Sequence, residues 1–204
     1  AIASLEGGFA EASKWTTAEL RERAVAATPD RLPAIFESLR RGVSVDDIHA
    51  TTRIDPWFLD RFAAMVEAEK ALAAELRESP ALSHDRLRAA KRAGLSDARI
   101  AAIAGLTEKA ITERREAMGL DPVYKRVDTC AAEFESHTPY LYSAYEDEDE
   151  AGESPSDRVI ILGNGPNRIG QGLEFDYACC HAAFAVRELG LTSVMVNCNP
   201  ETVS

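Results

Sequence analysis

Four glycines crowd the segment GNGPNRIGQG, residues 163–172, which follows the apolar run RVIIL. A glycine-rich turn between a strand and a helix can bind phosphate, because free backbone N–H groups and the helix dipole favour an anion there. The spacing does not match a dinucleotide fingerprint, since Arg168 stands where the third glycine of G-x-G-x-x-G would be. A Gly-Lys-Ser/Thr ending is absent, and Pro166 lacks an N–H donor. We therefore interpret the segment as a tight turn with another ligand-facing role.

The residues that most often bind metals or act as nucleophiles are scattered along the chain. The histidines are at positions 49, 84, 137 and 181, and no Ser-His-Asp or Cys-His arrangement can be identified. Cys179, Cys180 and His181 are consecutive on an expected helix, so their side chains point in different directions and cannot reach one ion. The four cysteines lack Cys-x-x-Cys spacing, which disfavours a zinc site and a disulfide framework and favours a reducing cytosol.

Residues 96–120 have the helix, glycine turn and second helix of a helix-turn-helix DNA reader. Residues 83–119 contain eight Lys or Arg and five Asp or Glu, which is only a mild positive excess. Three glutamates of the second helix would repel phosphate beside its cations, namely Glu108, Glu113 and Glu116. The pattern therefore favours an ordinary pair of antiparallel helices, with no nucleic acid as a partner.

The composition bounds the class of protein. With 204 residues, of which 46% are hydrophobic, the chain can bury a core and form one or two domains. No run of apolar residues is long enough for a membrane span, the start does not resemble a secretory signal, and the missing initial Met suggests an excised or processed chain. The net charge is −11, but residues 128–157 contain ten acidic residues and no Lys or Arg. The acidity thus belongs to one segment. From the cysteine pattern and the lack of a long apolar run, we expect a cytoplasmic protein with no membrane partner.

Several helix signals position these residues, and they are concentrated in residues 16–120. Thr16 and Glu19 fit a capping box, and Ser44 with Asp47 repeats the pattern. Three short helices are expected at about 84–93, 97–104 and 108–118, separated by GLS and GLT, in which a Gly ends one helix and a Ser or Thr begins the next.

The clearest helix signal begins at Asp55 and Pro56, which suit the N-cap and the first helical position. An apolar stripe of helical period follows it: Phe58, Phe62, Met65, Val66 and Leu72. No segment of this region alternates with period two, so we predict an all-α domain.

The rest of the chain differs in composition. Residues 121–157 show little helical periodicity, and Tyr140, Tyr142 and Tyr145 could anchor an extended segment on a surface. Residues 146–157 have the composition of a solvated, charged linker. Residues 158–204 read as strand, glycine-rich loop, helix and strand, which is the opening βαβ unit of a parallel sheet. One such unit cannot cover both faces of a sheet, so we expect a truncated α/β domain.

Long motifs identify a resemblance at this point. The runs RVIILGNGPNRIGQGLEFDYACCHAAFAVRELG and VMVNCNPETVS closely resemble the start of the second half of the large subunit of carbamoyl phosphate synthetase. DPVYKRVDTCAAEF matches the usual family run except at Asp121, and ATTRIDPWFLDRF is similar to the helical oligomerisation domain between the two halves. The resemblance implies four segments: the tail of the first half at 1–15, the helical oligomerisation domain at 16–120, an extended acidic linker at 121–157 and a Rossmann-like pre-ATP-grasp domain from 158.

The family's activity is what this resemblance implies for the parent protein. Its first half combines bicarbonate and ammonia with ATP to give carbamate, and its second half phosphorylates carbamate with another ATP. Ammonia comes from glutamine through an amidotransferase small subunit, and a C-terminal domain binds allosteric effectors. The cofactors of such an enzyme are ATP with Mg²⁺ or Mn²⁺, and K⁺, but the resemblance implies that the ATP-grasp lobes lie outside this chain. We therefore expect a non-catalytic structural module that self-associates as a dimer or tetramer.

The resemblance also implies positions for the residues near the glycine-rich turn. In the family this loop borders the passage by which carbamate reaches the second active site. We expect six residues to face that passage: Arg168, Gly170, Gly172, Glu174, Asn199 and Glu201. An arginine could attract an anionic intermediate, and a glycine leaves room beside a passage. A helix-turn-helix regulator with an α/β ligand-binding tail and a small dinucleotide-binding enzyme remain as alternatives.

Overall fold

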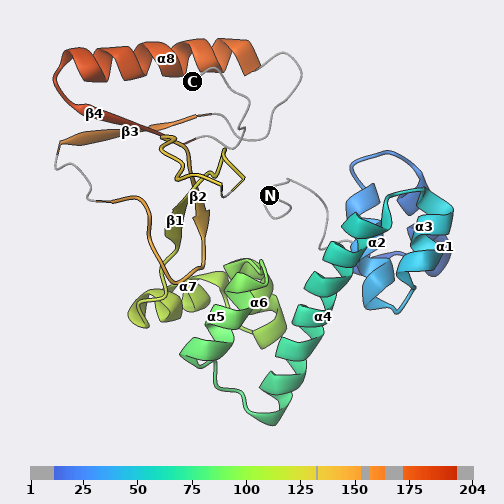
Figure 1. Cartoon of the computed structure of the whole chain (residues 1–204). Coiled ribbons are helices and arrows are strands. Elements are labelled where there is room, and N and C mark those ends of the chain that lie inside the picture. The colour runs from blue at the N-terminus through green and yellow to red at the C-terminus, as the bar shows by residue number, and fades with distance from the viewer. Residues whose placement is uncertain (1–11, 132, 153–156, 164–171, 197–204) are drawn as a thin grey trace. The chain divides into compact units, whose positions relative to one another are not determined.

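The structure is a computed structural model, and it describes residues 12–131, 133–152, 157–163 and 172–196, the last range without the side chains of 172–176. Contacts divide the chain into a unit spanning Glu6–Glu150, here called the helical unit, and a unit that contains Ala151–Ser204, here called the α/β unit. Figure 1 shows the helices and strands of both. The helical unit extends past its own last helix, which ends at Ala117, because the strands at 123–126 and 141–144 belong to the same unit.

The long helix α4, Pro56–Glu78, carries two groups of shorter helices (Figure 1). The first lobe comprises a short 3₁₀ turn, Ala12–Lys14, and three helices packed near the start of α4: α1 (Thr17–Val25), α2 (Arg31–Arg40) and α3 (Val45–Thr52). Its largest fully buried side chains are Leu20, Ile35, Leu59 and Val66.

The second lobe comprises three helices, α5 (His84–Arg92), α6 (Asp97–Ala104) and α7 (Glu108–Ala117). The later part of α4 packs against α5 and α6 and contributes Leu72 to their core. That core is a single cluster of buried residues: Leu72, Leu82, Leu87, Ala90, Leu95, Ile100, Ala101, Ile111 and Leu120. Each lobe thus has a core of its own. Full burial of one such Leu or Ile side chain contributes roughly 1.5–3 kcal/mol to stability.

The predicted helix caps are confirmed. Thr16 and Glu19 form a complete capping box, and the Ser44 hydroxyl accepts a hydrogen bond from the Asp47 N–H. Asp55 accepts from the Trp57 N–H at 2.9 Å, with Pro56 at the first helical position. Two of the short helices begin after Ser96 and Thr107, as predicted, and each cap accepts from an N–H three residues later. Ser83, for which no cap was predicted, begins the first short helix in the same way. Residues 96–120 accordingly form a packed pair of helices, α6 and α7.

The apolar stripe of α4 differs from the prediction at one end and in its middle. Phe58 was expected in the stripe, but it is 52% exposed, and Leu59 is buried instead. The buried positions follow the spacing 59, 66, 69 and 72, which places Glu69 in the stripe. At the start of α4 the buried face therefore contains Leu59, one residue after the predicted Phe58.

Two short strands follow α7, and the segment after the second strand returns to the first. Strand β1, Val123–Arg126, pairs antiparallel with β2, Leu141–Ala144, and Tyr124 lies opposite Ser143. Of the three tyrosines expected to anchor the segment, Tyr145 packs against the core of the second lobe. Tyr140 and Tyr142 are more than half exposed.

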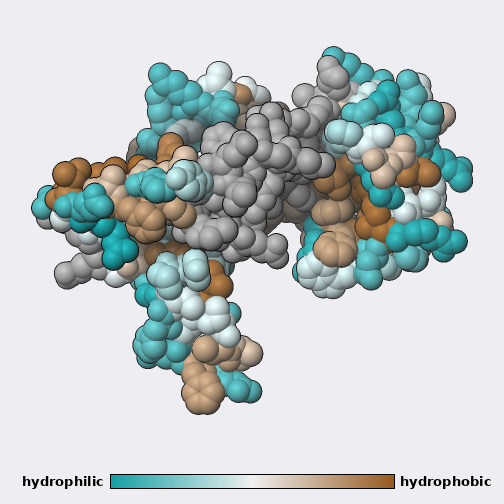
Figure 2. Space-filling model, turned by 90° about the horizontal axis from the view of Figure 1, so that it is seen from above, coloured by the Kyte–Doolittle hydropathy of each residue, from teal (hydrophilic) through white to brown (hydrophobic). Residues whose placement is uncertain are grey.

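The α/β unit contains the predicted βαβ arrangement. Strands β3, Arg158–Leu162, and β4, Thr192–Val196, are parallel, and the connecting helix α8, Gly172–Glu188, packs against both. Its exposed hydrophobic residues include Ile160 and Leu162 on β3 and Phe184 and Leu189 around the end of α8. Figure 2 shows hydrophobic residues at the surface of this unit, on the left of the view. Across the described residues, no helix is both long and apolar enough to cross a membrane.

Candidate functional site

The residues predicted to face a passage lie mostly outside the described part of the chain. Arg168, Gly170, Asn199 and Glu201 are outside the described residues. Gly172 begins α8, and Glu174 belongs to the same helix, but its side chain is outside the description. The positions of these side chains therefore stay predictions.

The elements that flank these residues are described. Ile160 pairs with Val194 in the parallel register, and the Gly163 N–H donates to the Val196 carbonyl at 2.7 Å. Because the strands are parallel, their carboxyl ends share one edge of the sheet. Strand β3 ends at Leu162 and strand β4 ends at Val196, so both strands end at this edge. Ligands of open α/β sheets bind at this edge, so the prediction is consistent with the topology.

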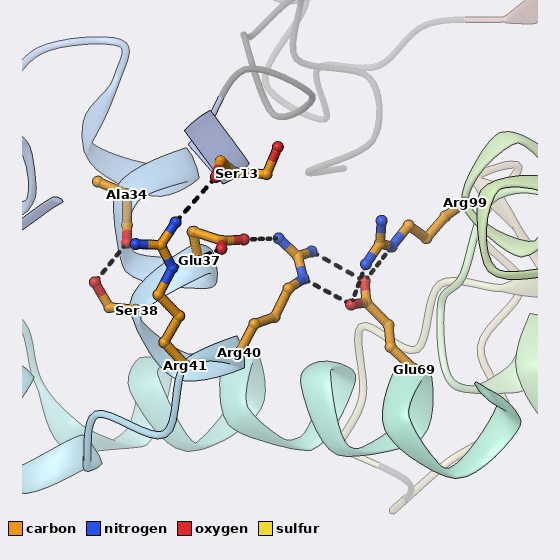
Figure 3. A network of polar contacts seen from close by, with 8 residues as sticks. All are labelled: Ser13, Ala34, Glu37, Ser38, Arg40, Arg41, Glu69 and Arg99. Carbon is orange, nitrogen blue, oxygen red and sulfur yellow. Dashed lines mark hydrogen bonds and ion pairs between the residues drawn. The ribbon is translucent and has the colours of Figure 1, made fainter. Parts of the chain in front are cut away.

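A cluster of charged side chains surrounds Glu69, in the middle of α4 (Figure 3). Arg40 at the end of α2 donates from Nε to Glu69 Oε2 at 2.8 Å and from Nη2 to Oε1 at 3.1 Å. Arg99 on α6 donates from Nε to Oε1 at 2.7 Å and from Nη2 to Oε2 at 2.6 Å. One carboxylate thus accepts two bidentate arginines, one from each lobe, and bidentate charged hydrogen bonds are among the strongest in proteins.

Burial and the ionic partners have opposite effects on the pKa values in this cluster. Glu69 is only 7% exposed. Burial by itself raises the pKa of Glu69, but the hydrogen bonds and positive charges of Arg40 and Arg99 outweigh it and hold the pKa below the ordinary value. Burial opposes the charge of Arg40 as well, yet Glu69 and Glu37 raise the pKa of Arg40 above its usual range. Glu69 and Arg40 are therefore both charged at neutral pH.

Glu37 extends the cluster toward the start of the first lobe. Arg40 Nη1 lies 3.6 Å from Glu37 Oε2, and Arg41 Nε lies 2.9 Å from Glu37 Oε1. Arg41 also donates to the Ser13 carbonyl at 3.1 Å (Figure 3). The 3₁₀ turn, α2, α4 and α6 are consequently joined by one chain of ion pairs and hydrogen bonds.

A second cluster surrounds Asp97 at the start of α6. Lys91 lies 2.7 Å from Asp97 Oδ1, and Arg115 Nε lies 3.2 Å from Oδ2. Burial raises the pKa of Asp97, but Lys91, Arg115 and a hydrogen bond from Thr112 together lower it by more. The pKa of Asp97 therefore lies below the ordinary value. Arg115 also donates to the Leu120 carbonyl at 2.9 Å, which fixes the exit from α7.

These two clusters are suited to holding helices together. Each carboxylate in them already accepts from cations, so none is placed to remove a proton from a substrate. In the part of the chain that the structure describes, no three His, Cys, Asp or Glu side chains converge where a metal ion could bind. A surface depression of about 230 Å³ lies between the end of α2 and α4, lined mainly by apolar residues that include Leu39, Val43 and Val66.

The sequence interpretation missed Glu69. Its signal is its register, because Glu69 lies three residues after Val66 and three before Leu72, in the middle of an apolar stripe. A charged residue at such a position is almost never buried without a partner. Arg40 and Arg99 could not be chosen as its partners from the sequence, since helix-rich chains offer many arginines at similar separations.

The fold and clusters define a class: a two-lobed helical module, joined by buried ion pairs, followed by the opening of a parallel α/β domain. Residues 1–119 match the family described as carbamoyl-phosphate synthetase large chain, oligomerisation domain. Residues 155–204 match the family described as carbamoyl phosphate synthase preATP-grasp domain. The chain belongs to the carbamoyl phosphate synthase large chain family.

Individual relatives agree with this assignment. The chain is 50% identical over 196 residues to the carbamoyl phosphate synthase large chain of Paenarthrobacter aurescens, covering 96% of this chain and 17% of the relative. It is 52% identical over 187 residues to that of Xanthomonas campestris pv. campestris, covering 92% of this chain and 17% of the relative. The chain thus spans about a sixth of the curated relatives it matches. The resemblance inferred from the motifs is confirmed, and the DNA-binding alternative receives no support.

Proposed function

We propose that the chain is part of a glutamine-dependent carbamoyl phosphate synthetase, an ATP-dependent ligase that serves arginine and pyrimidine synthesis in the cytoplasm. The observation that carries this proposal is the order of the two family matches, with an oligomerisation domain at 1–119 and a preATP-grasp domain at 155–204. In the parent enzyme, bicarbonate, ammonia and two ATP yield carbamoyl phosphate. Glutamine supplies the ammonia through an amidotransferase small subunit, and allosteric effectors bind elsewhere.

The helical unit is the self-association and spacing module of that enzyme, forming a dimer or tetramer. Its family description supports self-association. Its internal chemistry supports a structural role, because the carboxylates of Glu69 and Asp97 are saturated by cations that join helices. A module of this kind presents a fixed surface to a second copy instead of a reactive group.

The chain has no catalytic activity of its own in this proposal. ATP, Mg²⁺ or Mn²⁺ and K⁺ belong to other parts of the parent enzyme in this proposal. The 204-residue chain, incubated with ATP, bicarbonate and either ammonia or glutamine, is expected to form no carbamoyl phosphate above a protein-free control. Formation of the product by the chain alone would contradict this part of the proposal.

The six loop residues border a passage for carbamate in this proposal. The shared carboxyl edge of β3 and β4 supports it. Arg168→Ala in a full-length large chain is expected to leave bicarbonate-dependent ATP hydrolysis intact while less carbamoyl phosphate forms per ATP consumed. An unchanged ratio of product to ATP would exclude a role for Arg168 in carbamate transfer.

A chimera tests the assignment of the chain to this enzyme. The matching segment of the Xanthomonas campestris large chain is replaced by these 204 residues, and ammonia-dependent carbamoyl phosphate synthesis is measured. We expect a soluble chimera to retain the activity, because the segment supplies spacing and association. A soluble, correctly assembled chimera without activity would count against the proposal.

A further inference from the structure

The acidic residues after β2 are held by one face of α5. Arg92 Nη2 lies 2.7 Å from Glu146 Oε2, and Arg92 Nη1 lies 3.7 Å from Asp147 Oδ2. Arg88 pairs with Asp147 as well. Arg88 and Arg92 are four residues apart and therefore share a face of the helix. Both acidic residues are thus paired with cations of the second lobe, although they were expected in a solvated linker.

An aromatic contact precedes these pairs. Tyr145 packs against the core of the second lobe, and Lys91 Nζ lies 5.0 Å from the centre of its ring. This distance is within the range of a cation–π interaction. Lys91 also pairs with Asp97 at 2.7 Å, so the tyrosine rests on a cation that is itself fixed. Tyr145 therefore anchors the start of the acidic run.

The end of the acidic run is held by the free edge of β1. Alternate N–H groups of β1 point away from β2, and Asp149 Oδ1 accepts from the Tyr124 N–H at 3.3 Å. Glu150 Oε2 accepts from the Arg126 N–H at 2.7 Å, and the Glu150 N–H donates to the Tyr124 carbonyl at 2.8 Å. A two-stranded hairpin is marginally stable alone, and unpaired strand edges are a liability. The acidic run satisfies this edge.

Lys125 adds a charge contact on the same strand. It pairs with Glu150 and lies 3.7 Å from Glu148 Oε2. The hydrogen bonds from Lys125 and the Arg126 backbone lower the pKa of Glu150, and Glu150 raises the pKa of Lys125. Every acidic side chain from Glu146 to Glu150 thus has a partner on α5 or β1.

We propose that residues 145–150 form an electrostatic clasp that ties the hairpin to α5 and sets the point at which the chain leaves the helical unit. This inference goes beyond the proposed self-association and does not depend on it. With the clasp closed, only residues 151–157 separate the held segment from β3, which begins at Arg158. If the chain instead left the unit at the end of the α7 region, residues 121–157 would intervene. The clasp therefore makes the connection between the two units short, and ionic strength controls it.

Hydrogen exchange in the whole chain, followed by mass spectrometry, tests the clasp. The measured peptides cover β1 and residues 141–152, at about 50 mM and at about 1 M salt. The Debye length, beyond which charges are screened, lies between roughly 10 and 30 Å at the lower concentration and is roughly 3 Å at the higher one. The double variant Glu146→Gln, Asp147→Asn removes two negative charges and changes no residue that belongs to a helix. We expect exchange of the Tyr124, Arg126 and Glu150 amides to accelerate about tenfold in this variant, and similarly in the wild type at high salt.

A charge swap and a matched control separate the clasp from general charge effects. Arg92→Glu is expected to open the segment, and Arg92→Glu combined with Glu146→Arg is expected to restore slow exchange. Arg114→Gln removes one charge from an exposed position on α7 and is expected to change nothing here. Circular dichroism verifies that each variant keeps its helices.

Two results would overturn the proposal. One is exchange of these amides that stays at the wild-type rate in the Glu146→Gln, Asp147→Asn variant. The other is equal opening in the charge-swapped and singly substituted chains, which would show that the pairing of residues 92 and 146 does not hold the segment.

Discussion

Arg99 and Glu69 are 30 residues apart in the chain, and Arg99 Nη2 lies 2.6 Å from Glu69 Oε2. Both oxygens of the same carboxylate also accept hydrogen bonds from Arg40, which is 29 residues away in the other direction along the chain. Glu69 is therefore the point at which α2 of the first lobe and α6 of the second are both fixed to α4. The two hydrophobic cores stabilise their own lobes, and this junction couples them.

Removing the charge at the junction should destabilise the helical unit. Glu69→Gln leaves two arginines facing a neutral amide, and loss of one partner of a buried ion pair costs about 3–5 kcal/mol. We expect roughly 3 kcal/mol, at the lower end, because the Arg99 side chain is 38% exposed and water can hydrate it. Urea unfolding followed by circular dichroism measures the change.

Glu67→Gln is the matched control for this substitution. Glu67 lies on the same helix, its side chain is 69% exposed, and it pairs with Lys70. Exposed pairs contribute about 0–1 kcal/mol, so the control should stay close to the wild type. Equal losses in the two variants would show that the buried junction has no special role.

The depressed pKa values of Glu69 and Asp97 predict loss of stability in acid. A carboxyl group whose pKa is lower in the folded than in the unfolded state stabilises the fold above the unfolded value, about 4. That stabilisation disappears as the pH falls through the folded value, because the unfolded chain binds more protons. The free energy of unfolding should therefore be nearly flat from about pH 7 to pH 5 and decrease below about pH 4.5.

The Glu69→Gln chain isolates the contribution of one carboxyl to this dependence. Its free energy of unfolding should decrease less steeply below about pH 4.5 than that of the wild type, since residue 69 no longer titrates. Parallel curves for the two chains would contradict the assignment of the acid sensitivity to Glu69.

The turn between α6 and α7 should depend on backbone conformation alone. Gly105 ends α6 with a φ of 67°, and a Cβ added there would meet no atom within 4 Å. Gly105→Ala should therefore cost about 1 kcal/mol through the left-handed conformation, without a steric clash. Gly105→Asn should cost less, because asparagine tolerates this region. Thermal unfolding of both variants measures the difference, and an alanine variant as stable as the wild type would contradict the argument.

The helices of this chain were predictable because their signals are local. Ser96 and Thr107 are caps of the right residue type, three positions before the N–H groups from which they accept, and glycines separate the short helices. The βαβ unit was predictable for the same reason, since two β-branched runs flank an amphipathic segment. Phe58 was placed wrongly because size and hydrophobicity alone do not fix which face of a helix is buried.

The charged contacts were not predictable, because they join distant residues. The pairing of Arg92 with Glu146 spans 54 residues, and an acidic run has the composition of a solvated spacer whether or not cations lie beside it. The hairpin was missed as well. Its strands are four residues each, and strands of that length carry almost no periodic signal.

Light scattering after size exclusion, over a wide range of concentrations, tests the central claim that the helical unit self-associates. The measurement compares the 204-residue chain with a version ending at Gly152, which retains both lobes, their cores and the clasp. We predict the same dimer or tetramer for both chains. A monomeric shorter chain beside an associating longer one would contradict the claim and assign the contact to exposed residues of the α/β unit such as Ile160 and Leu162.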